Sequence, residues 1–424
     1  MKQYNILVFP CGSEIGLEIH RALKNSIHFK LIGGSSVNDH GRFVFENYID
    51  KIPFIDNEEF LPTLKKLTTN YKIDAIYPTM DKVIEVLKKN EEYLCCKVIS
   101  SSTTTTEICL SKSKTYELLK DTIKVPVVYN KDNCTNFPVF VKPDVGYGSR
   151  GAKTVKSKKE LLLSLEENPS LIISEFLPGE EYTVDCFTDS NKNLLFVGPR
   201  KRARTMNGIS VNTIPIEENK EMFYEIAEKI NSKINFRGAW FFQLKEDENS
   251  QLTLLEVASR FAGSSSLFRA KGINFPLLSL FDSFDIPVSI IENNYLIEMD
   301  RALNNKYKLN IDFNEVFVDF DDCLFSSDYG FNTDIMKFIF SCKNKKIRIN
   351  LISRHEGDLL KKLKELQIFQ LFDEIFHLTK FQKKSSYITN KKAIFIDDSF
   401  SERDDVFKNC KIPVFSVDMV EVLV

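Results

Sequence analysis

The chain has 424 residues, 43% hydrophobic and 27% charged, which is a globular composition and enough length for two to four domains. Its formal net charge of -2 gives no electrostatic reason to expect a nucleic-acid partner. No apolar run is long enough to span a bilayer, and residues 5–10 are too short for the apolar core of a signal peptide. We therefore expect neither nucleic acid nor a membrane as a partner.

The nine cysteines are scattered along the chain, and no C-x-x-C pair occurs. Cys95 and Cys96 are adjacent, a spacing that suits neither a disulfide framework nor a structural zinc site. These features predict a reducing, cytoplasmic setting.

The first hundred residues alternate between strand-like and helix-like patterns. The strand-like runs are residues 6–10, 29–33, 75–78 and 97–100, and the helix-like stretches are residues 15–23, 58–67 and 82–89. Such alternation predicts an α/β fold with a doubly wound parallel sheet. The turn at residues 11–16 precedes a helix as a phosphate-binding loop would, but it lacks G-x-G-x-x-G, so a plain tight turn is the better interpretation.

Two polar stretches divide the chain. A Ser/Thr run covers residues 100–106, and a second polar connection covers residues 304–314. From Val316 the β/α alternation resumes and continues to the last residue. We predict three domains: residues 1–100, residues 101–308 with a central lobe at about 113–180, and residues 314–424.

The central region contains a strand followed by a glycine-rich loop. Lys142 lies in the strand at residues 137–144, and the loop at residues 145–151 contains Gly146, Gly148 and Gly151. Glycines let backbone N–H groups approach phosphate oxygens, and a lysine adds a point charge. A glycine hairpin without a ligand is the alternative.

Two later strand-like runs, residues 241–245 and 254–260, suit an antiparallel pair joined by the polar turn at residues 246–250. Period-two alternation then lets Gln243 and Glu256 point to one face, where oxygen ligands suit Mg²⁺. Each residue alone could occupy a solvated strand position.

On these motifs, residues 1–308 resemble an ATP-grasp enzyme of the carbamoyl-phosphate synthetase large-subunit type, as found in carboxylate–amine ligases. The resemblance implies a Rossmann-like pre-ATP-grasp domain and a two-lobed α+β ATP-grasp domain. It implies these nucleotide contacts: Lys112 (or Lys114) and Lys142 with phosphates, Glu175, Phe176 and Leu177 with adenine, Glu181 with ribose, and Gly148 and Ser149 over the phosphates.

The same resemblance implies the reacting end of the site. Gln243 and Glu256 would bind Mg²⁺, with Mn²⁺ as an alternative, Arg260 would stabilise the transferring phosphoryl group, and Arg202 and Arg204 would face the acceptor or the acyl-phosphate. The family pattern E-x-N-P-R has asparagine where this chain has Ala258, which cannot coordinate a metal. Either a second Mg²⁺ is held by fewer protein ligands or catalysis is weakened.

Three apolar strands of the last 110 residues each end in polar side chains. Asp319 and Asp321 follow the first strand, Ser353 ends the second at residues 347–352, and Asp397 with Asp398 follows the third at residues 393–396. Parallel strands bring their carboxyl ends to one edge of the sheet. Because neighbouring carboxylates repel one another, a divalent cation is their natural partner.

Residues 314–424 therefore resemble a small, doubly wound haloacid-dehalogenase (HAD) type phosphohydrolase with the motif Asp319-Phe320-Asp321. Only about thirty residues separate Asp321 from Ser353, and a similar number separates Ser353 from Lys384. These spans leave no room for a large cap domain. The spacing therefore predicts an open site, whose substrate is bulky or is covered by another part of the chain. The resemblance implies these roles: Asp319 as nucleophile, Asp321 as general acid/base, Ser353 on the phosphoryl oxygen, Lys384 (or Lys383) as charge partner, and Asp319, Asp321, Asp397 and Asp398 (or Glu402) around Mg²⁺.

Together these resemblances predict a bifunctional enzyme. One half would be an ADP-forming carboxylate–amine ligase that works through an acyl-phosphate, and the other a Mg²⁺-dependent phosphatase that works through an aspartyl-phosphate. The expected partners are ATP, a small carboxylate, an amine, and a phosphorylated small molecule or conjugate, with oligomerisation left open. The alternatives are an ATP-grasp kinase or carbamoyl-phosphate-type synthase with a phosphatase, and a nucleotide-binding regulatory module that has lost ligase activity.

Overall fold

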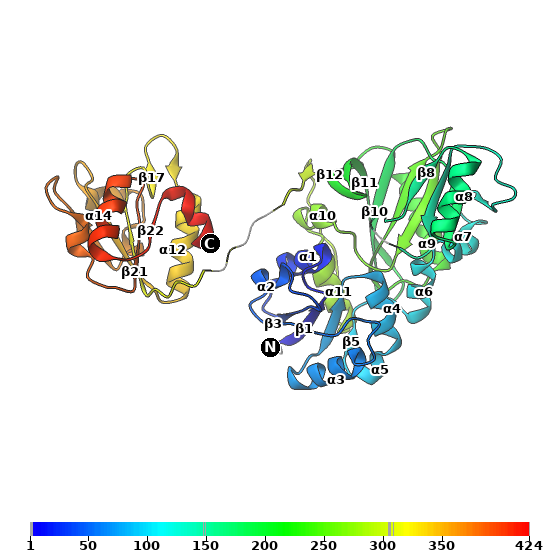
Figure 1. Cartoon of the computed structure of the whole chain (residues 1–424), viewed down its shortest axis with the longest axis horizontal. Coiled ribbons are helices and arrows are strands. Elements are labelled where there is room, and N and C mark those ends of the chain that lie inside the picture. Colours follow the sequence, from blue (N-terminus) through cyan, green and yellow to red (C-terminus); the bar gives the residue numbers. More distant parts are fainter. Residues whose placement is uncertain (1–2, 147, 149, 304–306, 308, 424) are drawn as a thin grey trace. The chain divides into compact units, whose positions relative to one another are not determined.

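The computed structural model describes residues 3–146, 148, 150–303, 307 and 309–423. The chain divides into two compact units, residues 1–304 and residues 305–424 (Figure 1). The predicted domain boundary near residue 100 lies inside the first unit and stays a prediction.

The first unit begins with a five-stranded parallel sheet in the order β3-β2-β1-β4-β5. Its strands are β1 (Tyr4–Phe9), β2 (Phe29–Gly34), β3 (Tyr48–Ile49), β4 (Ala75–Pro78) and β5 (Lys97–Val98). Its helices are α1 (Glu14–Leu23), α2 (Gly41–Val44), α3 (Phe60–Asn70), α4 (Asp81–Lys89) and α5 (Glu91–Leu94). Because β1 lies between β2 and β4, the strand order reverses there, and a crevice opens at the carboxyl ends of β1 and β4.

Helix α1 shows why the sequence folds as predicted at this crevice. The Ser13 hydroxyl accepts a hydrogen bond from the Gly16 N–H at 3.0 Å and so caps the helix. Ile15, Ile19 and Leu23, spaced four residues apart, are buried against the sheet. The turn that precedes the helix is therefore held in one conformation at the crevice.

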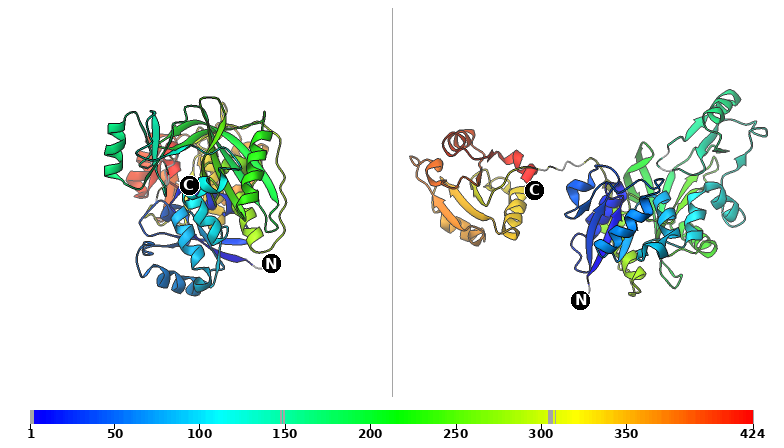
Figure 2. Two further views of the ribbon diagram at one scale, coloured as in Figure 1. Left: turned by 90° about the vertical axis from the view of Figure 1, so that its right-hand side faces the viewer. Right: turned by 60° about the horizontal axis from the view of Figure 1, so that its bottom comes forward.

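Two antiparallel sheets complete the first unit (Figure 2). The smaller, β6-β9-β7-β8, contains β6 (Val128–Tyr129), β7 (Val139–Pro143), β8 (Lys153–Val155) and β9 (Leu171–Glu175), with helices α6 (Thr103–Leu110), α7 (Lys112–Leu119) and α8 (Lys158–Glu167). The larger, β14-β13-β10-β11-β12-β15, contains β10 (Glu181–Thr188), β11 (Leu194–Met206), β12 (Ile209–Pro215), β13 (Gly238–Glu246), β14 (Leu252–Ala258) and β15 (Met299–Asp300), with helices α9 (Glu221–Lys233), α10 (Ser266–Ala270) and α11 (Phe275–Ser283).

One hydrophobic core joins the parallel sheet to the larger antiparallel sheet. Ile6 and Val8 of β1 belong to the same buried cluster as Phe268 of α10 and Phe275 of α11. Burying these apolar surfaces together stabilises a single unit, because each sheet alone would leave one face exposed to water.

The second unit is a five-stranded parallel sheet in the order β20-β19-β16-β21-β22. Its strands are β16 (Glu315–Val318), β19 (Arg348–Ser353), β20 (Glu374–His377), β21 (Ala393–Ile396) and β22 (Val414–Phe415), with a hairpin of β17 (Phe325–Ser326) and β18 (Gly330–Phe331). Its helices are α12 (Thr333–Asn344), α13 (Leu359–Glu365) and α14 (Phe400–Cys410), with 3₁₀ turns η1 (Phe369–Leu371), η2 (Lys384–Tyr387) and η3 (Val417–Leu423). Within residues 309–423, the hairpin is the only extra structure between β16 and α12.

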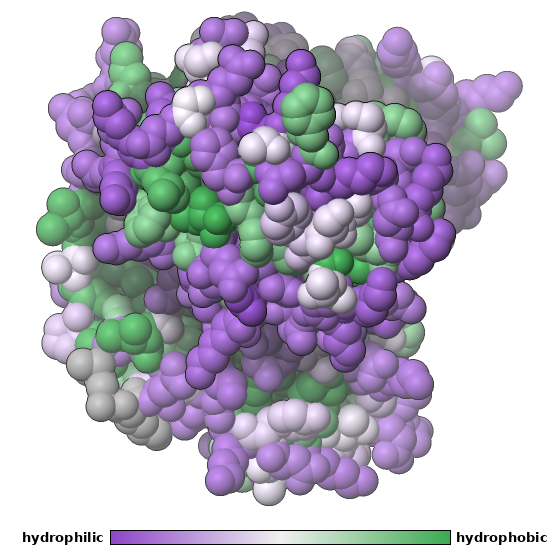
Figure 3. Space-filling model, turned by 90° about the vertical axis from the view of Figure 1, so that its left-hand side faces the viewer, coloured by the Kyte–Doolittle hydropathy of each residue, from purple (hydrophilic) through white to green (hydrophobic). Residues whose placement is uncertain are grey.

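The surface seen in Figure 3 is largely hydrophilic, with apolar side chains gathered in separate patches. Every helix in the described ranges is too short or too polar to cross a lipid bilayer.

Candidate functional sites

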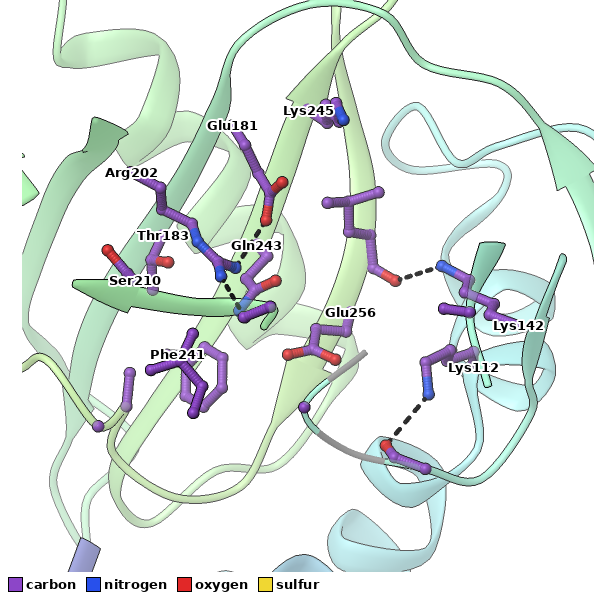
Figure 4. A pocket seen from close by; sticks show the side chains of 18 of the residues that line it. Lys112, Lys142, Glu181, Thr183, Arg202, Ser210, Phe241, Gln243, Lys245 and Glu256 are labelled. Carbon is purple, nitrogen blue, oxygen red and sulfur yellow. Dashed lines mark hydrogen bonds and ion pairs between the residues drawn. The ribbon is translucent and has the colours of Figure 1, made fainter. Parts of the chain in front are cut away.

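A cavity of about 470 Å³ opens in the first unit where its three sheets approach one another. Its walls come from the loops after β1 and β4, from β7, β8 and β9 of the smaller sheet, and from β10 to β14 of the larger sheet (Figure 4). Among the nucleotide and metal positions predicted for this unit, Ser149 lies outside the described residues, and all the others except Arg204 line the cavity.

Two lysines project toward the cavity from the smaller lobe. The Lys142 ammonium donates to the Tyr116 hydroxyl at 2.7 Å and to the Leu255 carbonyl at 3.2 Å. Lys112 donates to the carbonyls of Asp144 and Gly146 at 3.2 and 3.4 Å. Burial, together with the charge of Lys112, lowers the pKa of Lys142 to about 8. Of the rivals Lys112 and Lys114, only Lys112 lines the cavity.

The segment after β9 forms an apolar wall beside these lysines. Glu175, Phe176 and Leu177 all line the cavity, and Leu177 is buried. Glu181, at the start of β10, also lines it and forms a 2.6 Å ion pair with Arg202. In the glycine loop, Gly148 lines the cavity with a φ of +60°, a backbone conformation that favours glycine.

The predicted antiparallel pair is present as β13 and β14. Gln243 and Glu256 are direct cross-strand partners, and both line the cavity. The Gln243 amide oxygen and the Glu256 carboxylate oxygens are the kinds of ligand that Mg²⁺ prefers, so these two residues fit a Mg²⁺ site. Ala258 pairs with Phe241 on β13 and offers no ligand atom.

Arg260, just beyond β14, is tied to the first sheet. Its guanidinium donates twice to the Asp81 carboxylate, at 2.8 and 2.9 Å, and lies 5.3 Å from the centre of the Phe241 ring. Asp81 begins α4 directly after β4, and the sequence analysis missed it. The sequence offered one indication of a role for Asp81, namely its position after a strand of the predicted parallel sheet.

Arg204, which was predicted to face the acceptor or the acyl-phosphate, does not line the cavity. Its side chain is 61% exposed and pairs with Asp300 at 2.8 Å. The register of β11 against β12 shifts between Lys201 and Arg204, so strict alternation of faces is lost after Arg202. Arg202 does line the cavity, and so does Arg200, which is buried and donates to Asp185 at 2.6 Å.

The turn at residues 11–16 also borders the cavity, through Ser13, Glu14 and Ile15. The Ser13 hydroxyl is engaged with the backbone of its own turn and with Thr79, which follows β4. These bonds support the interpretation as a tight turn, placed here at the rim of a ligand cavity.

A second cluster lies at the carboxyl edge of the sheet in the second unit. The buried Lys384 ammonium donates to Asp319 at 2.7 Å and to Asp397 at 2.6 Å. Ligand atoms of Asp319, Asp397 and Asp398 all lie within 4.8 Å of one another. Burial, together with the charge of Asp319, raises the pKa of Asp397 to about 7. Three carboxylates this close together, two of them paired with Lys384, fit a divalent cation.

The alternatives left open for this unit differ in their surroundings. Lys383 is exposed and pairs with Asp405, so Lys384 is the lysine within the cluster. Glu402 is paired with Arg354 and stands outside the three-carboxylate group, which leaves Asp398 as the supporting carboxylate.

The Asp321 side chain does not join this carboxylate group, contrary to its predicted place among the metal ligands. It instead contacts the His355 Nδ1 at 2.8 Å and 3.0 Å through its two oxygens, and accepts a long hydrogen bond of 3.5 Å from Ser353. The physical reason is the turn after β16, which directs Asp321 toward the end of β19. His355 was missed, although it lies two residues after the strand-end Ser353.

Comparison with known proteins places the first unit in context. Residues 167–293 match the family described as "ATP-grasp in the biosynthetic pathway with Ter operon". The chain is 29% identical over 183 residues to the vancomycin/teicoplanin A-type resistance protein VanA of Enterococcus faecium, covering 36% of this chain and 53% of that protein. It is 27% identical over 252 residues to 3-methyl-D-ornithine–L-lysine ligase of Methanosarcina mazei, covering 57% and 63%. The chain thus spans about half to two thirds of these relatives.

A solved structure gives the same picture of the fold. The biotin carboxylase domain of Hydrogenobacter thermophilus 2-oxoglutarate carboxylase, crystallised with MgADP, ADP and bicarbonate, superposes with a TM-score of 0.58 at 14% identity, covering 68% of this chain and 71% of that one. Family match and fold together support the ATP-grasp assignment of the first unit. ATP-grasp enzymes use ATP with Mg²⁺, which agrees with the cofactors expected from the sequence.

The lowered pKa of Lys142 predicts a pH-dependent nucleotide affinity. A bound phosphate stabilises the ammonium and raises its pKa, so affinity for ADP should fall as the pH rises above about 8, by up to about tenfold per pH unit. Calorimetric titration between pH 7 and 9.5 measures this slope. Lys142→Met should bind more weakly without the slope, and Lys114→Met should keep it; a wild-type slope in Lys142→Met would contradict the assignment.

The two arginines of β11 should differ in their effect on stability. Arg202→Ala removes a buried guanidinium and leaves Glu181 unpaired, so the free energy of unfolding should fall by about 2 kcal/mol or more. Arg204→Ala removes an exposed pair and should cost less than about 1 kcal/mol. Urea denaturation followed by tryptophan fluorescence reports this unit, because Trp240 is the chain's only tryptophan. Equal losses would show that the register shift does not separate their environments.

Proposed function

We propose that the first unit is an ATP-dependent ligase that joins a carboxylate to an amine and releases ADP and phosphate. The observation that carries this proposal is the convergence, in one cavity, of Lys112 and Lys142, the apolar wall after β9, the oxygen pair Gln243–Glu256, and Arg260. The likeness to 3-methyl-D-ornithine–L-lysine ligase supports an amide-forming reaction over phosphorylation alone.

In the proposed reaction, a carboxylate oxygen attacks the γ-phosphorus of ATP, and the bond to the ADP oxygen breaks. The amine nitrogen then attacks the acyl carbon, so that phosphate and a proton leave. Lys112, Lys142 and Arg260 offset the charge of the phosphoryl groups, and a Mg²⁺ bound by Gln243 and Glu256 supplies further charge neutralisation. Positioning and charge, rather than covalent participation by the protein, lower this barrier.

Proposed roles for the remaining residues follow from their places in the cavity. Glu175, Phe176 and Leu177 would contact adenine, and Glu181 the ribose hydroxyls once it is released from Arg202. Arg202 lies on the larger sheet, on the wall away from Lys112 and Lys142 (Figure 4), and Arg200 lines the cavity from the same strand; both would hold the substrate carboxylate or the acyl-phosphate. The loop of residues 146–151 would cover the phosphates and exclude water.

We further propose that the second unit is a HAD-type phosphohydrolase. The Asp319 carboxylate would attack the phosphorus, the ester oxygen would leave with a proton from Asp321, and water activated by Asp321 would then cleave the aspartyl-phosphate. Lys384, already bonded to Asp319, offsets its charge, and Ser353 would hold a phosphoryl oxygen. A Mg²⁺ bound by Asp319, Asp397 and Asp398 would supply the remaining positive charge.

The ligase proposal is tested by substrate-dependent phosphate release. Purified protein is supplied with ATP, Mg²⁺ and pools of carboxylates and amines, and new amides are sought by mass spectrometry. We expect ADP release to require both a carboxylate and an amine, and Arg260→Ala to lower turnover by about a hundredfold or more. Nucleotide binding without any turnover would favour a regulatory module, and ADP release with a carboxylate alone would favour a kinase.

The phosphatase proposal is tested with p-nitrophenyl phosphate. Hydrolysis should require Mg²⁺ and should fall by about a thousandfold or more in Asp319→Asn, because the nucleophile is lost. Lys383→Met and Lys384→Met form a matched pair of neighbouring lysines. Only Lys384→Met should lose activity, because only Lys384 contacts Asp319. Unchanged hydrolysis in Asp319→Asn would exclude this residue as the nucleophile.

A further inference from the structure

Three aromatic side chains are the most exposed large hydrophobic residues of the second unit, within residues 309–423. Phe381 is 94% exposed, Tyr329 is 91% exposed and Phe400 is 75% exposed. The next in rank, Phe407 and Phe340, are only 55% and 53% exposed. Aromatic rings left almost wholly in water give up a large hydrophobic gain, so three such rings on segments from one edge of a sheet point to a contact with another molecule.

Each ring lies in a segment that follows the carboxyl end of a strand of the sheet: Tyr329 and Phe381 lie in turns, and Phe400 is the first residue of α14. Tyr329 lies in the turn of the β17–β18 hairpin, which directly follows Asp321 and is bridged to it at Phe325. Phe400 comes two residues after Asp398. The neighbouring Ser399 N–H donates to Asp397 at 2.8 Å.

Phe381 belongs to the loop that brings Lys384 to Asp319. The next residue, Gln382, accepts a 2.6 Å hydrogen bond through its carbonyl from Arg354, which follows Ser353 directly. The segments after β16, β20 and β21 therefore all leave the same carboxyl edge of the sheet, and each carries one exposed ring within the segment that follows the strand.

None of these rings is needed to hold its own loop. The hairpin is closed by Phe325 and Phe331, whose ring centres are 5.2 Å apart. The loop of Phe381 is held by the bond from Arg354 and by the Lys384 ion pairs. The Arg403 guanidinium lies 5.9 Å from the centre of the Phe400 ring and leaves most of that ring exposed.

We propose that Tyr329, Phe381 and Phe400 form an aromatic rim that binds the organic part of the phosphate ester. This inference rests on the proposed phosphatase function and specifies its substrate class. The leaving group carries a planar or otherwise apolar moiety that packs on the rim rings while its phosphate reaches Asp319. Small polyol phosphates are poor substrates, because they have no apolar surface to pack there and the unit, in its described residues, has no lid to enclose them.

Binding is measured separately from leaving-group chemistry with phosphonates, whose C–P bond is not hydrolysed. Inhibition constants against p-nitrophenyl phosphate hydrolysis are determined for naphthylmethylphosphonate, methylphosphonate and inorganic phosphate. We expect the aromatic phosphonate to bind about tenfold or more tighter than methylphosphonate, which corresponds to one or two ring contacts. The combined variant Tyr329→Ser/Phe381→Ser/Phe400→Ser should lose this preference, with inhibition by inorganic phosphate unchanged. Phe340→Ser, on α12, is the matched control and should keep the preference.

The outcomes separate the two levels of the proposal. Equal inhibition by the two phosphonates in the wild type, or a preference that survives the combined variant, overturns the rim while leaving the phosphatase standing. Failure of the wild type to hydrolyse any phosphomonoester overturns the phosphatase itself. Self-association of the chain, measured by sedimentation, that disappears in the combined variant while the phosphonate preference persists would assign the rings to a second copy and overturn the proposal.

Discussion

The ion pair between Arg260 and Asp81 is the interaction on which the cavity of the first unit depends. The two residues are 179 positions apart, and their paired bonds join the carboxyl edge of the parallel sheet to the end of β14. The hydrophobic core already joins the two sheets, and this ion pair adds a polar contact between the crevice at β1 and β4 and the end of β14, beside the oxygen pair of Gln243 and Glu256. Both side chains are largely withdrawn from solvent, so removing either one would leave an uncompensated charge at the cavity wall.

The same pair bears on the proposed chemistry. The two hydrogen bonds to Asp81 fix the orientation of the Arg260 guanidinium. A phosphoryl group that enters the cavity would therefore contact a guanidinium that does not have to change its rotamer. Asp81 offsets part of its charge in the absence of substrate, which lessens the cost of keeping Arg260 away from water. Arg260 is thus a structural link between two sheets and also the cation nearest the end of β14.

Sequence reasoning succeeded where local pattern and backbone direction agree. The parallel sheets followed from β/α alternation, and the facing of Gln243 and Glu256 followed from period-two alternation across a short polar turn. The failure at Arg204 arose from a register shift, which alternation alone cannot reveal. Asp81 and His355 were missed because their roles depend on tertiary contacts with residues far away in sequence. The sequence could not decide between Lys112 and Lys114, or between Lys384 and Lys383. The choice in each pair depends on the direction in which the side chain leaves a helix or a turn.

The two candidate sites differ in how much of a metal site the protein itself supplies. The first unit offers one carboxylate and one amide at the expected position, since Ala258 replaces a third ligand. A cation held by so few oxygens needs the phosphates of ATP to complete its shell, so metal and nucleotide should enter together. The second unit brings three carboxylates within 4.8 Å of one another, two of them paired with Lys384, and this excess of negative charge would favour a cation before any substrate arrives. Under the proposed functions, metal binding would be coupled to nucleotide in the first unit and independent of the phosphate ester in the second.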